Sequence, residues 1–150
     1  MKPDAVVRMT RTDAWILAAI GSEKAITLDD LVSSADYLNR LIPSKTEVEE
    51  AVNHLVKAGL AQEQDRRFRL TAEGRGWLER FGWGSRGVIL VWIELADAWN
   101  GMELPLKDPA SDFMLEPGEL EGAVAAHHRF VQEWIAKRKR ERNPGGLRGE

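Results

Sequence analysis

The sequence predicts a mainly α-helical fold that contains one short β-hairpin and continues into further helices at its C-terminal end. Three observations predict this fold. Residues that favour helix N-termini precede several runs of apolar residues at helical spacing. Between residues 60 and 70 the spacing changes to alternation, which is typical of a half-buried strand. Helical spacing of apolar residues returns after residue 117.

The first two helices are predicted from their ends. We expect the first to begin at Thr12, a good N-cap, and to stop at Gly21, since glycine is common just after a helix. The second begins at Thr27, with Asp30 three residues later in a capping box. It ends before Pro43, because the residue that precedes a proline disfavours the helical region.

The third helix has the clearest local pattern in the chain. Ser44 and Glu47 form a capping box, and Gly59 follows the last turn. Its apolar stripe consists of Val48, Ala51, Val52 and Leu55.

A hairpin is predicted over residues 60–70, since Phe68 and Leu70 alternate with Arg67 and Arg69. Thr71 then caps a fourth helix that runs to about Phe81.

The second half of the chain is predicted to be helical around one loop. Residues 88–99 are apolar on every side and fit a buried helix or a buried strand; we favour the helix, because Asn100 and Gly101 make a natural stop. Residues 102–117 hold three prolines and are expected to form an irregular loop. A long helix then runs from Glu119 to about Arg140. We expect a first domain over 1–82, a helical extension over 83–142, and a flexible tail over 143–150.

Part of the first domain resembles a known group of proteins. The stretches 44–48, 55–60 and 68–74 look like the recognition helix, wing and following helix of bacterial winged helix-turn-helix regulators, and are similar to those of the MarR-like and PadR-like groups. The resemblance covers about residues 12–81. It implies a winged helix-turn-helix domain that binds double-stranded DNA and regulates transcription.

The resemblance and the chemistry of the side chains together give the expected DNA contacts. In such domains the third helix, here residues 44–58, enters the major groove, and the wing contacts the backbone. An asparagine can pair with adenine through two hydrogen bonds, and a lysine can reach guanine or phosphate. The expected DNA-binding residues are Lys45, Thr46, Glu50, Asn53 and Lys57 on the helix, with Arg66, Arg67 and Arg69 on the wing.

The charge distribution favours a second hypothesis, in which the domain binds protein and not DNA. The whole chain carries a net charge of −3. Residues 1–80 hold 12 basic and 13 acidic side chains, whereas residues 81–136 hold 3 and 9. Glu49 and Glu50 on the third helix would repel phosphates. The one strongly basic run, 137–142, is either a phosphate-binding arm or a helix end with cations that suit the helix dipole.

The C-terminal helices are expected to form a homodimer. Two strongly apolar segments exceed what a domain of about 70 residues can cover, and an exposed patch of that size is a liability in a monomer. The expected interface residues are Val124, Phe130, Val131, Trp134 and Ile135.

Other classes of function are not expected. The chain has no cysteine, and we find no phosphate-binding glycine loop and no catalytic spacing of serine, histidine and aspartate, so neither an enzyme nor a cofactor is expected. His127 and His128 are adjacent, so they point about 100° apart on a helix and do not suit a shared metal.

The six tryptophans either line an effector pocket or fill the core, and we favour the core. No signal peptide or membrane span is expected, and the cytoplasm is the expected compartment.

Overall fold

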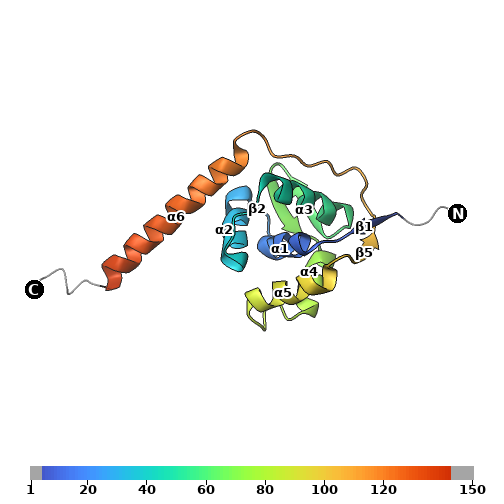
Figure 1. Cartoon of the computed structure of the whole chain (residues 1–150), viewed down its shortest axis with the longest axis horizontal. Helices are drawn as coiled ribbons and strands as arrows, with labels where there is room; N and C mark the ends of the chain where they lie inside the picture. The colour runs from blue at the N-terminus through green and yellow to red at the C-terminus, as the bar shows by residue number, and fades with distance from the viewer. Residues whose placement is uncertain (1–4, 143–150) are drawn as a thin grey trace, which may run out of the picture.

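The computed structural model describes residues 5–142 and consists mainly of helices with two small antiparallel sheets. Figure 1 shows the elements. In chain order they are β1 (Val6–Arg8), α1 (Arg11–Ile20), β2 (Ile26–Thr27), α2 (Leu28–Asn39), α3 (Lys45–Lys57), β3 (Ala61–Gln64), β4 (Arg67–Leu70), α4 (Ala72–Arg80), α5 (Val88–Trp99), β5 (Glu103–Pro105) and α6 (Glu119–Arg142).

Capping boxes fix the start of three helices. At α2 the pair is Thr27 with Asp30, and at α3 it is Ser44 with Glu47, both as predicted. The predicted start of α1 was wrong. Thr10, not Thr12, is the N-cap, because its hydroxyl accepts from the N–H of Asp13 while the Asp13 carboxylate accepts from the N–H of Thr10.

The predicted hairpin is present as β3 and β4, and β2 adds to β4 as a third strand. Asp65 and Arg66 make the turn with φ of 53° and 62°. Both values lie in the left-handed region that two-residue hairpins need, here reached without glycine.

The second sheet was not predicted. It pairs β1 with β5, so that Val7 faces Leu104. The expectation of irregular structure throughout 102–117 was therefore wrong at residues 103–105, where a partner almost a hundred residues away makes the strand.

The core is built around α1, on which residues 13–20 are all buried. The three helices α2, α3 and α5 pack against it. Residues 88–99 form a helix, as favoured from the sequence. Three tryptophans fill much of the space, namely Trp15, Trp92 and Trp99.

A close backbone approach joins the end of α3 to α4. Thr71 caps α4 at the N–H of Gly74, and its hydroxyl donates to the carbonyl of Gly59. A Cβ built on Gly74 would lie 2.0 Å from the carbonyl oxygen of Leu60. Only glycine fits at this position, which explains the "TAEG" sequence that follows the hairpin.

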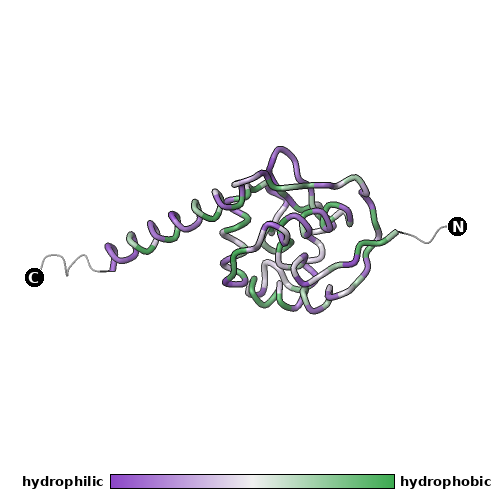
Figure 2. Tube along the Cα trace, turned by 45° about the horizontal axis from the view of Figure 1, so that its top comes forward, coloured by the Kyte–Doolittle hydropathy of each residue, from purple (hydrophilic) through white to green (hydrophobic). Residues whose placement is uncertain are grey.

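Helix α6 leaves the body of the molecule, as Figure 1 shows. Its first half packs on α2, and its second half extends beyond the body. Figure 2 shows apolar positions among the hydrophilic turns of this projecting part. Within residues 5–142, no helix combines the length and the apolar character that crossing a membrane requires.

The arrangement of α1 to α4 with the three-stranded sheet is consistent with the winged-helix expectation. The tail predicted over 143–150 lies outside the described residues.

Candidate interface at the third helix and the hairpin

The residues expected to contact DNA fall into two groups in the structure. Five of them are exposed, on the first turns of α3 and on the hairpin: Lys45, Thr46, Glu50, Arg67 and Arg69. The other three, Asn53, Lys57 and Arg66, are half-buried under another part of the same chain.

That covering part is the segment between β5 and α6, residues 106–118, which we call the strap. Figure 1 shows it running from β5 past α3 to the start of α6. Its successive contacts are one turn apart on α3. The N–H of Lys107 donates to the carbonyl of Lys57 at 2.7 Å, Asn53 comes next, and the N–H of Leu115 donates to the Glu49 carboxylate at 2.7 Å. The strap therefore runs antiparallel to α3 along its outer face.

Asn53 makes the central contact with the strap. Its side-chain oxygen accepts from the N–H of Phe113 at 2.7 Å and from the hydroxyl of Ser111 at 2.6 Å. Its side-chain nitrogen donates to the carbonyl of Phe113 at 3.0 Å. The amide thus pairs with the backbone N–H and C=O of one residue through an acceptor and a donor, the same two groups that it would offer to adenine.

Apolar side chains hold the strap in the groove between α3 and the hairpin. Phe113 and Leu115 are buried, at 7% and 4% exposure. The Phe113 ring contacts the ring of Phe68 on β4 edge to face, with centroids 5.4 Å apart. The guanidinium of Arg66 lies 4.9 Å from the centroid of the Phe113 ring. Burial of two such side chains favours the closed strap by several kcal/mol, on the order of 1.5–3 kcal/mol each.

Arg66 closes the far end of the strap. Its guanidinium donates to the carbonyl of Met114 at 3.0 Å and to both carboxylate oxygens of Glu119 at the start of α6. The hydrogen bonds between the two side chains raise the pKa of Arg66 and lower the pKa of Glu119. The guanidinium expected to contact phosphate is therefore paired with a carboxylate within the chain.

The strap also changes the charge of the surface around the groove. It carries one basic residue, Lys107, which pairs with Glu73, and three acidic residues, Asp108, Asp112 and Glu116, all exposed. Glu50 on α3 and Asp65 at the hairpin turn are exposed as well, so the strap adds negative charge to a surface that already carries carboxylates. Such a surface opposes the approach of a phosphate backbone.

The expected dimer residues also divide into two groups. Val124 packs partly against the core of its own chain. Phe130, Trp134 and Ile135 are exposed at 60%, 50% and 45%, and Val131 is half-buried beside them.

Sequence analysis missed a second polar cluster, which joins α6 to α2. The ring of buried His127 lies between Ser33, 2.8 Å from Nδ1, and Asp36, 2.8 Å from Nε2. Ser33 and Asp36 come from α2 and His127 comes from α6, so the two hydrogen bonds of the imidazole join the helices directly. We interpret the cluster as a polar clamp between the two helices.

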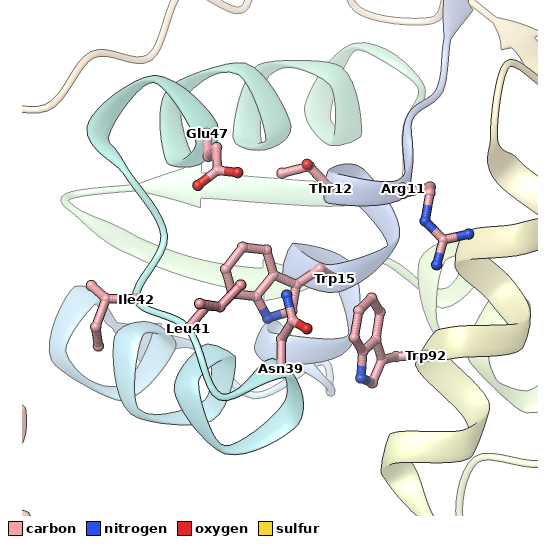
Figure 3. A pocket seen from close by; sticks show the side chains of 8 residues that line it. All are labelled: Arg11, Thr12, Trp15, Asn39, Leu41, Ile42, Glu47 and Trp92. Carbon is pink, nitrogen blue, oxygen red and sulfur yellow. The ribbon is translucent and has the colours of Figure 1, made fainter.

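A hollow of about 500 Å³ lies beside the α2–α3 turn. Figure 3 shows the eight residues that line it, with Trp15 and Trp92 at its floor. Both indole N–H groups already donate to backbone carbonyls, those of Ala35 and Leu38, and Arg11 pairs with Asp97. The two indole N–H groups and the guanidinium at this hollow are therefore occupied within the chain.

One signal in the sequence could have revealed the strap. Phe113 and Leu115 are separated by one residue in a segment that otherwise lacks apolar pattern, and this alternation is typical of an extended segment with one buried face. Comparison of the chain with known protein families, curated proteins and solved structures gave no match.

Proposed function

We propose that this chain is a winged-helix protein-interaction module, in which the groove between α3 and the hairpin binds an extended peptide segment. The bidentate pairing of the Asn53 amide with the backbone of Phe113 is the observation that carries this proposal. Contacts with the backbone give affinity for any extended segment, and pockets for alternate side chains give selectivity.

The apolar contacts supply the selectivity. Phe113 and Leu115 enter the groove while Met114 between them is 65% exposed. The groove therefore favours a segment in which two apolar residues, the first aromatic, are separated by one residue of any kind. The stacked guanidinium of Arg66 adds a preference for an acidic residue beyond them, as Glu119 shows within the chain.

DNA binding, with regulation of transcription, is the second candidate function. The exposed side chains of Lys45, Arg67 and Arg69 favour it, since they could contact phosphates. In this function the strap would have to leave α3 before Asn53 could reach a base. The acidic strap would then act as an internal competitor of DNA.

A homodimer held through α6 belongs to both candidate functions. Phe130, Val131, Trp134 and Ile135 support it, because they form an apolar surface that residues 5–142 leave largely uncovered. Val124 contributes less, since its own chain already covers part of it.

One full-length variant distinguishes the two candidate functions. Phe113→Ala with Leu115→Ala removes the buried anchors of the strap and leaves α3 and the hairpin unchanged. We expect this variant to bind a fluorescent peptide of residues 106–118, and to bind it much more weakly when Asn53→Ala is added. The same peptide with both anchors replaced by alanine is the matched control, and a thermal melt verifies folding.

DNA binding is measured on the same variant over a range of salt concentrations. We expect no affinity for duplex DNA beyond that of the wild type. Peptide binding that is absent, together with DNA affinity that rises when the strap is released and falls steeply with salt, would replace the first candidate by the second.

A further inference from the structure

The two halves of α6 lie in different environments. Leu120, Ala123 and His127 in the first half are buried against the rest of the chain. The second half of the helix projects from the body (Figure 1), and it carries exposed Phe130, Trp134 and Ile135. A separate helix of about 15 residues is only marginally stable in water, so the projecting half needs cover on its apolar side.

One line of residues along α6 continues from the covered half into the uncovered half, and four of its six members are apolar. Its members alternate between spacings of four and three residues, the heptad pattern of a coiled-coil seam. They are Leu120, Val124, His127, Val131, Trp134 and Arg138. The last of them keeps its guanidinium 4.9 Å from the centroid of the Trp134 ring, so its stem extends the seam.

We infer that the projecting half of α6 pairs with the same segment of a second copy of this chain in antiparallel orientation. The inference rests on the homodimer proposed above and adds the direction of the helices and the site at which their basic ends bind. A two-fold axis between residues 132 and 133 places Val131 of each chain against Trp134 of the other.

Charge decides the direction. Residues 137–142 carry five basic side chains and one acidic side chain. Parallel helices would place two such runs side by side, which is unfavourable. Antiparallel helices separate the runs and place each one beside the α2–α6 junction of the other copy.

That junction is suited to a cation. A pocket of about 300 Å³ lies between α2 and α6, lined by Asp29, Asp30, Ser33, Ala126, His127 and Phe130. In the antiparallel register Lys137 of one chain lies beside Phe130 of the other. Its ammonium group can then lie close to the Asp29 carboxylate at the mouth of the pocket, with its stem against the Phe130 ring.

Disulfide trapping tests the direction. The chain has no cysteine, so any disulfide that forms must join the introduced cysteines. A chain with both His128→Cys and Ile135→Cys should form a covalent dimer under mild oxidation, because positions 128 and 135 face each other across antiparallel helices. Arg138→Cys alone should not, because position 138 faces itself only in a parallel pair. The reverse result would overturn the antiparallel arrangement.

Light scattering tests the dimer itself. Trp134→Glu should shift the full-length protein to monomer, whereas Ile93→Glu, at a comparably exposed apolar position on α5, should leave the dimer unchanged. A wild-type monomer would overturn both the homodimer and this inference. A dimer that survives Trp134→Glu would overturn the inference alone.

A charge exchange tests the binding of the basic end. Lys137→Glu and Asp29→Lys should each weaken dimerisation roughly five- to tenfold, because each breaks an exposed pair that occurs twice in the dimer. The two changes in one chain should restore much of the wild-type affinity. Losses that simply multiply would overturn the Lys137–Asp29 contact.

Discussion

The Nδ1 atom of His54 on α3 lies 2.9 Å from Oδ2 of Asp13 at the start of α1, and 1% of the Asp13 side chain is exposed. The same carboxylate oxygen accepts the N–H of Thr10. One buried carboxylate therefore caps α1 and joins it to α3. The hydrogen bond to Asp13 raises the pKa of His54 above its ordinary value, although partial burial acts in the other direction.

This pair predicts a pH-dependent stability. Because the pKa of His54 is higher in the folded chain than in the unfolded chain, protonation favours folding. That stabilisation is fully present below a pH of about 6.5 and is lost as the pH rises through the folded pKa. His54→Gln should therefore lose more free energy of unfolding at a pH of about 5.5 than at about 9, as measured by urea denaturation. His128→Gln, at an exposed position on α6, controls for the loss of an imidazole; equal losses at both pH values for His54→Gln would contradict the prediction.

The two glycines of α4 should respond to alanine in opposite directions. At Gly74 the new Cβ would meet the Leu60 carbonyl at 2.0 Å, so α4 or the end of α3 must shift, and we expect a loss of at least 2 kcal/mol, on the order of an overpacked core. At Gly76 a Cβ meets nothing within 4 Å, and the higher helix propensity of alanine should stabilise the chain by up to about 1 kcal/mol. Thermal melts of the two variants measure the difference. A change of stability in the same direction for both variants would mean that the Leu60 carbonyl does not lie close to Gly74.

The indole N–H groups of Trp92 and Trp99 should differ in their contribution to stability. Trp92 donates to the carbonyl of Leu38 at 3.0 Å, whereas the buried N–H of Trp99 has no partner among residues 5–142. Replacement of either indole by benzothiophene keeps the shape and removes the donor. We expect a loss of about 1 kcal/mol at Trp92 and no loss at Trp99. Chemical denaturation measures both, and a clear loss at Trp99 would indicate a partner for its N–H.

The ion pair between Arg66 and Glu119 should control how often the strap opens. Glu119→Gln removes the charge that holds Arg66, and since both side chains are partly exposed we expect a weakening of about 1 kcal/mol. Protease cleavage within residues 106–118 should then be roughly fivefold faster. Glu121→Gln, two residues further along α6 and exposed, should leave the rate unchanged. Equal rates in the wild type and the Glu119 variant would mean that the apolar anchors alone hold the strap.

The elements that the sequence predicted well are those with local causes. Ser44 and Glu47, or Thr27 and Asp30, interact over three residues, so the pattern can be read directly from the sequence. The prediction for the start of α1 was wrong by two residues, although Thr10 and Asp13 have the same spacing as the other two capping boxes. The alternation of Phe68 and Leu70 was enough to place β4.

The strap and the second sheet depend on contacts between distant parts of the chain. Asn53 and Phe113 are 60 residues apart, and Arg66 and Glu119 are 53 apart. No pattern of neighbouring residues in the sequence indicates that the members of either pair meet. The place of Asn53 on α3 therefore predicts a DNA contact, whereas in the folded chain the backbone N–H and C=O of Phe113 occupy its amide. Lys45, Arg67 and Arg69 are exposed, because alternation and helical spacing determine which side a residue faces.

The strap is attached to the body at both ends, by the pairing of β1 with β5 and by the packing of α6 on α2. It therefore occupies the groove as a tethered ligand, at an effective concentration on the order of millimolar. A separate peptide that made only the same contacts would have to reach that concentration to fill half of the grooves. A partner that acts at micromolar concentration must gain further contacts outside the groove, and the exposed Lys45, Arg67 and Arg69 lie where such contacts would form.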